Sequence, residues 1–93
     1  MLELIKKRCG ISVSVYDEDI EVYMADCRED MIASGVPEEL FSEDKTEINE
    51  QVATAMTLYV KAYLGNDRSD TEKYLDLYRK KVFRLTLEGD GSV

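Results

Sequence analysis

The apolar residues of this chain recur at spacings of three and four, which is the period of an α-helix with one buried face. Such stripes occupy four segments, each followed by glycine, proline or a polar break. Residues 11–16 instead alternate apolar and polar side chains, but no clear partner strand follows, and we interpret them as an extended connector. The sequence therefore predicts an all-α fold, a small four-helix bundle with a short first helix and three longer ones.

The first two helices have recognisable ends. The first is expected to stop near Gly10, and its stripe consists of Leu2, Ile5 and Cys9. The second begins at Asp17, where acidic residues crowd the first turn and the helix dipole favours their charge. Its stripe consists of Ile20, Tyr23, Met24, Cys27 and Met31. Gly35 and Pro37 end this helix, and Pro37 is expected to start a single helical turn.

The last two helices are predicted to form an antiparallel hairpin. Asp44 and Glu47 have capping-box spacing for the third helix, and Ser69 and Glu72 have it for the fourth. The expected stripe of the third helix is Ile48, Val52, Ala55, Met56, Tyr59, Val60, Tyr63 and Leu64. The expected stripe of the fourth is Tyr74, Leu77, Tyr78, Val82 and Leu85.

Four tyrosines flank the polar break between these helices, in pairs four residues apart: Tyr59 with Tyr63, and Tyr74 with Tyr78. Rings so placed either form a seam between the helices or offer a platform on which bases stack. A stacking platform needs basic surroundings, whereas residues 67–76 contain several carboxylates. We therefore expect the tyrosines to pack across the hairpin.

The length of 93 residues corresponds to one domain, expected at residues 1–87 and followed by a flexible polar tail at 88–93. No apolar run is long enough to cross a membrane, and the one near the N-terminus is too short for a secretory signal. Cys9 and Cys27 lie on apolar stripes, so buried structural thiols in a reduced compartment are favoured over a redox pair.

Most catalytic arrangements are excluded by composition. The chain has no histidine, no Gly-rich phosphate loop and no dinucleotide fingerprint. The polar break at 65–70 lacks the residue order of a calcium loop, and the carboxylates at 17–21 are two residues apart and do not converge on a helix. We predict no enzymatic activity, no cofactor and no metal, with an enzyme or metal protein as the least favoured alternative.

Charge is distributed unevenly along the chain. The net charge of −8 argues against sequence-independent binding to the phosphates of duplex DNA. Residues 38–50 are the most acidic stretch. One basic cluster lies late in the sequence, at Arg79, Lys80, Lys81 and Arg84, and Lys6, Lys7 and Arg8 are candidates to join it. This cluster either complements the helix dipole on a solvated face or contacts an acidic surface, such as residues 38–50 of a neighbouring copy. Head-to-tail contacts of that kind close into rings when the rotation permits.

Three segments, in this order, resemble the small all-helical head–tail connector (head-completion) proteins of long-tailed bacteriophages and prophages. They are "YDEDIEVYMADCREDMIASG", "INEQVATAMTLYVKAYLGN" and "SDTEKYLDLYRKKVFRLTL". The resemblance spans roughly residues 2–87. It implies an adaptor that assembles as a ring under the portal, extends the DNA channel and carries the next head-completion or tail protein.

The resemblance also implies a place and a set of contacts. The protein would be made in the cytoplasm of a bacterial host and lie at the head–tail junction of the virion, where DNA only passes through the channel. Because loops and terminal segments make the subunit and portal contacts in the family, the candidate contact residues are Glu43, Asp44, Glu47, Asn66, Asp67, Arg68, Arg79, Lys80 and Arg84. The alternative is a small acidic regulator or inhibitor that binds another protein through residues 38–50.

Overall fold

The computed structural model describes residues 1–41, 49–64 and 68–90, without the side chains of 68–69 and 88–90. Within these ranges the chain forms helices and no strand, which confirms the all-α prediction. The elements are α1 (Leu2–Arg8), α2 (Asp17–Ala33), the 3₁₀ turn η1 (Glu38–Phe41), α3 (Glu50–Leu64) and α4 (Arg68–Asp90).

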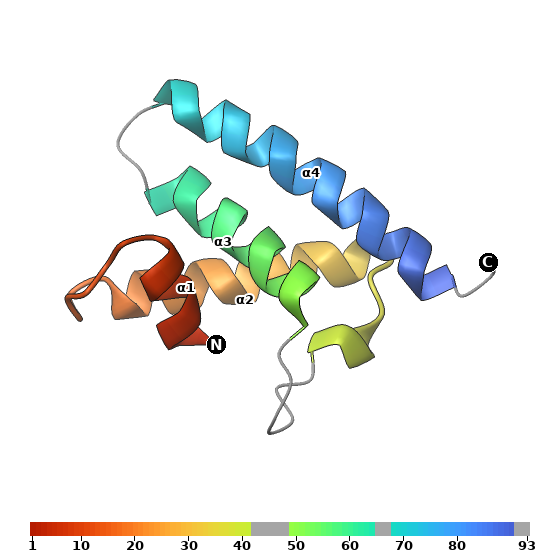
Figure 1. The fold of residues 1–93 in the computed structure, drawn as a ribbon, viewed down its shortest axis with the longest axis horizontal. Coiled ribbons are helices and arrows are strands. Elements are labelled where there is room, and N and C mark those ends of the chain that lie inside the picture. The colour runs from red at the N-terminus through yellow and green to blue at the C-terminus, as the bar shows by residue number, and fades with distance from the viewer. Residues whose placement is uncertain (42–48, 65–67, 91–93) are drawn as a thin grey trace.

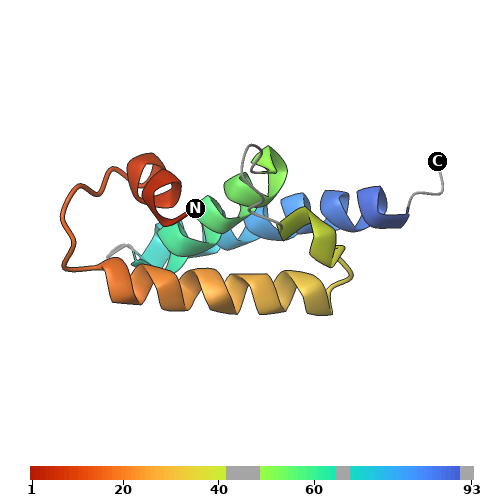
Figure 2. The ribbon, with the colours of Figure 1, turned by 90° about the horizontal axis from the view of Figure 1, so that it is seen from below.

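Helix α3 is the centre of the molecule. It packs most extensively against α4, which runs alongside it in the opposite direction (Figure 1), and also against α2 and α1. In the view of Figure 2, α1 and α2 lie on opposite sides of α3. Because α3 has neighbours on several sides, small residues outside its expected stripe, such as Ala53 and Thr57, are buried as well.

The two glycines predicted to end helices do so by the same motif. Gly10 and Gly35 have φ of 73° and 107°, a region that glycine enters without the steric cost of a Cβ. After α2, the amide of Val36 donates to the Met31 carbonyl at 3.0 Å and the amide of Gly35 donates to the Ile32 carbonyl at 3.0 Å. The amides of residues 10 and 11 bond back to α1 in the same way. These are Schellman caps, which satisfy carbonyls that the helix leaves unpaired.

The starts of the last two helices differ from the sequence prediction. Asn49 caps α3, because its Oδ1 accepts hydrogen bonds from the amides of Gln51 at 2.9 Å and Val52 at 3.1 Å. The predicted capping pair Asp44 and Glu47 lies outside the described residues. Helix α4 already begins at Arg68, so Ser69 lies inside its first turn and is not the cap.

The core is formed mainly by α2, α3 and α4, with Ile5 contributed by α1. Its fully buried large side chains are Ile5, Ile20, Cys27, Met31, Val52, Val60 and Leu85. Leu77 was expected in the stripe of α4 but is 41% exposed, whereas Leu75 is half-buried. The core side of α4 therefore consists of Tyr78, Val82 and Leu85, and Leu77 lies outside it.

Candidate interaction surface

A line of tyrosine rings connects three helices. The ring of Tyr59 meets that of Tyr78 at 5.1 Å in an edge-to-face arrangement, which confirms the predicted seam between α3 and α4. Tyr59 also touches Tyr63 at 4.8 Å, and Tyr63 stacks on Tyr23 of α2 at 5.8 Å. Tyr63 therefore turns toward α2, where it is 47% exposed, and does not face α4 as predicted.

Tyr74 was also expected to pack against another ring in the seam, and it does not. Its ring instead lies 5.8 Å from the Lys61 ammonium, an attraction between a cation and the electron-rich ring face. Both partners stand at the end of the hairpin where α3 finishes and α4 begins.

Both cysteines are free thiols. Cys27 is fully buried, and this burial raises its pKa to about 12, so it is protonated at neutral pH. Burial also raises the pKa of the partly exposed Cys9. Thiols held in the protonated form are poor nucleophiles, which fits structural roles for both.

Two of the basic residues named as candidates to join the cluster on α4 already have partners within the molecule. Lys6 forms an ion pair with Asp17 at 2.7 Å, and this hydrogen bond raises the pKa of its ammonium. Arg8 reaches Glu50 at 2.6 Å, next to Gln51, which accepts a 2.6 Å hydrogen bond from Lys81. The Lys6 pair joins α1 to α2, whereas the bonds of Arg8 and Lys81 tie α1 and α4 to the first turn of α3.

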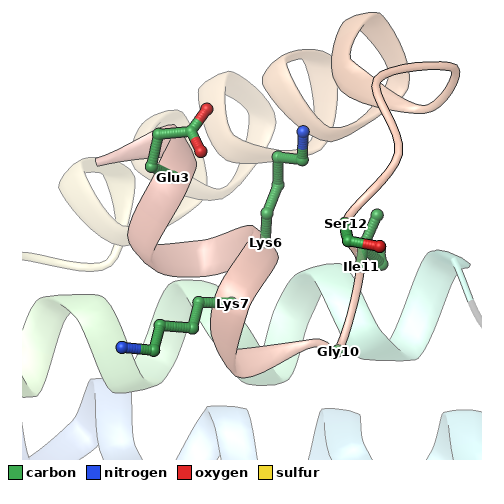
Figure 3. Close-up of a pocket in the computed structure, with 6 residues that line it drawn as sticks. All are labelled: Glu3, Lys6, Lys7, Gly10, Ile11 and Ser12. Carbon is green, nitrogen blue, oxygen red and sulfur yellow. The ribbon is translucent and has the colours of Figure 1, made fainter.

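A shallow pocket lies between α1 and the connector that follows it (Figure 3), lined by Glu3, Lys6, Lys7, Gly10, Ile11 and Ser12. The side chains of Lys6 and Lys7 point to opposite sides of α1, so their ammonium groups do not converge on one anion. Within the described ranges, no three His, Cys, Asp or Glu side chains gather where they could hold a metal ion. In the same part of the chain, no helix has the length and apolar character needed to cross a membrane.

The cationic residues late in α4 surround an apolar patch. Phe83 is 64% exposed and Leu87 is 51% exposed, and they lie four residues apart on one side of the helix. Arg79 precedes Phe83 by one more turn, and Lys80 and Arg84 are placed on the flank of the patch by the helical period. Arg79 and Phe83 also line a cleft against α2, together with Asp30, Ser34 and Thr86. We call Arg79, Lys80, Phe83, Arg84 and Leu87 the α4 surface.

A second exposed apolar patch lies on the connector between α1 and α2. Val13, Val15 and Tyr16 are all exposed, and Val15 is 74% exposed. The first turn of α2 follows directly, with Glu18 and Asp19 exposed beside the patch. We call Val13, Val15, Tyr16, Glu18 and Asp19 the connector surface. Figures 1 and 2 place it at the opposite end of the molecule from the C-terminal end of α4.

Arg79, Lys80 and Arg84 are the predicted contact residues that the structure describes in full, and all three are exposed. Glu43, Asp44, Glu47, Asn66 and Asp67 lie outside the described residues, as does the side chain of Arg68. Sequence reasoning missed Phe83 and Leu87. Their signal is an apolar pair at helical spacing that falls outside the buried stripe of α4.

The family model of phage connector proteins matches residues 1–92 of the chain. The match takes in all the described helices and both glycine-ended turns. No curated protein and no solved structure matches the chain significantly.

Proposed function

The chain belongs to the phage connector protein family, and on this premise we propose that it is a structural subunit of the head–tail junction of a phage or prophage particle. In this proposal several copies assemble as a ring under the portal protein and extend its DNA channel. The far side of the ring then receives the next head-completion or tail protein. The observation that carries the proposal is the family match over residues 1–92.

The surface chemistry supports a role in protein contact. Both the α4 surface and the connector surface combine exposed apolar side chains with charge, as protein interfaces commonly do at their centre and rim. The net charge of −8 disfavours strong attachment to DNA, so packaged DNA would slide through a channel built from such subunits. We propose no catalytic step and no cofactor.

Family membership favours this role over the acidic regulator or inhibitor, because that alternative draws only on the acidic stretch 38–50. Competition with DNA for a basic partner, lost on Glu→Gln substitution in that stretch, would instead support the regulator.

Electron microscopy of the chain mixed with its portal protein tests the proposal. We expect a second ring of density on the portal, absent when the portal is imaged alone. A monomer in isolation is compatible with the proposal, since assembly can require the portal as a template. A chain that stays monomeric at high concentration and also fails to bind the portal would contradict it.

A further inference from the structure

We propose that neighbouring copies of this chain pair head to tail, with the α4 surface of one copy seated on the connector surface of the next. The inference rests on the proposed ring, because a ring requires a contact between subunits, and it identifies the two surfaces that form this contact. It also replaces residues 38–50 with the start of α2 as the acidic partner of the basic cluster.

The α4 surface stands at the projecting end of its helix. Gly35, just after α2, lies against Thr86, since a Cβ on Gly35 would be 3.7 Å from the Thr86 methyl carbon. Helix α4 continues from there to Asp90, past the end of α2 (Figure 2). Leu87 is therefore beyond the last turn that α2 covers, and Phe83 borders the cleft between the two helices. The apolar side chains are left accessible because the molecule has no further element to cover them in the described part of the chain.

The connector surface is accessible for a related reason. The chain leaves α1 at Gly10 and turns into α2, and the Asp17 amide donates to the Ser14 carbonyl at 3.1 Å across this turn. The pair of Lys6 with Asp17 holds the turn against α1. Val15 thus stands at the outside of a turn that is fixed at both ends.

The charges around the two surfaces favour pairing of an α4 surface with a connector surface over pairing of two identical surfaces. Arg79, Lys80 and Arg84 border the apolar residues of the α4 surface, whereas Glu18 and Asp19 border those of the connector surface. Joining two α4 surfaces, or two connector surfaces, would bring like charges together, which disfavours a two-fold symmetric dimer. Pairing unlike surfaces brings opposite charges together around an apolar centre.

Two acidic residues lie close to the basic side chains of the α4 surface. Asp30 shares the cleft with Arg79 and Phe83, but it already accepts the hydrogen bond of the Tyr78 hydroxyl. Lys80 does pair with Asp76 at 3.2 Å, but both side chains are largely exposed, and such helix pairs contribute little and exchange readily. In the sequence, the basic residues of the α4 surface fall within 79–84, and the acidic residues Glu88 and Asp90 follow them. In the described residues, no ion pair joins Glu18 or Asp19 to another side chain.

The position of the two surfaces determines the kind of assembly. The connector surface lies at one end of the longest dimension, 41 Å, and the α4 surface extends toward the other end, so one copy cannot bring its own surfaces together. Each added copy leaves one free surface of each kind. Such a heterologous contact continues from copy to copy and closes into a ring when the rotation per subunit allows it.

Disulfide cross-linking tests the contact directly. A variant with Val15→Cys and Leu87→Cys, in a Cys9→Ser background, is oxidised mildly alone and on the portal, and then run on a denaturing gel. Disulfides need Cα atoms about 4.4–6.8 Å apart. We therefore expect bonds only between copies, seen as a ladder of dimers, trimers and larger species that a reductant abolishes.

The single-cysteine variants are the matched controls. In a head-to-tail contact, Leu87→Cys alone and Val15→Cys alone give no ladder. Efficient dimer formation by Leu87→Cys alone, with no ladder from the pair, would show that α4 surfaces pair with each other and would overturn the proposal.

Charge reversal gives a second, independent readout. Lys80→Glu with Arg84→Glu, or Glu18→Lys with Asp19→Lys, should each reduce ladder formation by roughly tenfold at low salt, and one chain carrying all four changes should recover it. Lys7→Glu with Lys73→Glu, and Glu29→Lys with Glu72→Lys, reverse the same number of charges at exposed positions outside both surfaces and serve as controls for net charge. Equal effects of the control and test reversals would count against the contact.

The outcomes separate this inference from the proposed function. If rings form on the portal and the cysteine pair gives no ladder, the head-to-tail assignment is wrong and the connector role stands. If the ladder forms in solution but the chain never binds the portal, the contact is supported and the connector role is wrong. No ladder under either condition overturns the contact.

Discussion

The Tyr78 hydroxyl donates a 2.7 Å hydrogen bond to Oδ2 of Asp30, and this bond joins α4 to α2 across the edge of the core. The ring of Tyr78 is buried, and its edge-to-face contact with the ring of Tyr59 joins α4 to α3. From α4, the side chain therefore contacts α3 through its ring, and α2 through its hydroxyl and the Cys27 thiol beside it. It connects the hairpin of α3 and α4 to the rest of the molecule.

Replacing Tyr78 with phenylalanine removes the hydroxyl and keeps the ring. We expect the free energy of unfolding to fall by about 1–2 kcal/mol, because a hydrogen bond to a charged acceptor is lost in a partly buried site. Urea denaturation followed by circular dichroism measures the change. Tyr74→Phe is the control, since its ring interaction with Lys61 does not need a hydroxyl. Equal effects of the two substitutions would show that the bond to Asp30 does not contribute.

Tyr63→Ala tests the line of rings between α2 and α3. We expect a loss of about 1 kcal/mol, because two ring contacts disappear while the side chain is already half exposed. Tyr59→Ala should cost more, since Tyr59 contacts the buried Tyr78 as well. Thermal unfolding of both variants gives the comparison. If Tyr63→Ala leaves stability unchanged and abolishes portal binding, the ring belongs to an interface with a partner.

Asn49→Ala removes the cap of α3. The two amides that now bond to the Asn49 side chain would lose that partner, and we expect a loss of about 0.5–2 kcal/mol. Asn49→Asp retains an oxygen acceptor and adds negative charge at the helix N-terminus, so it should be near neutral. Chemical denaturation of the wild type, Asn49→Ala and Asn49→Asp measures the free energy of unfolding of each. An equal loss in the aspartate variant would rule out capping as the cause.

The protein should lose stability above about pH 9. Burial raises the pKa of Cys27 from 9.0 to about 12 and is the main cause of the raised pKa of Tyr59, from 10.0 to about 12. Between the unfolded and folded pKa values the native state keeps protons that the unfolded state has lost. Stability then falls with rising pH, with a slope of up to about 1.4 kcal/mol per pH unit for each such group.

Denaturation midpoints from pH 7 to 11 measure this slope. In Cys27→Ala the slope between pH 9 and 11 should be smaller than in the wild type, whatever the overall stability of the variant. The same burial predicts that a thiol reagent labels Cys27 only after unfolding, whereas the partly exposed Cys9 reacts in the native state. Native labelling of Cys27 at the rate of Cys9 would contradict the assignment of a buried thiol.

Much of the local structure follows from sequence because its causes are local. Gly10 and Gly35 end helices with positive φ, as their positions after apolar stripes predict. Acidic residues open α2, and a single turn follows Pro37. The cap of α3 was misassigned because Asp44 and Asn49 both satisfy the chemistry of a cap. Which one does so depends on where the helix packs.

The sequence by itself determined the helices, their order, most of the buried stripe residues and the presence of a basic cluster on α4, since these depend on side-chain spacing within one segment. Only the tertiary structure decided that Leu77 is exposed, that Tyr63 turns toward α2, and that Phe83 and Leu87 form an uncovered patch. Exposure of a helical residue depends on which neighbour covers it and where that neighbour ends. Helix α2 ends at Ala33 and its cap packs on Thr86, so the last turns of α4 project beyond it.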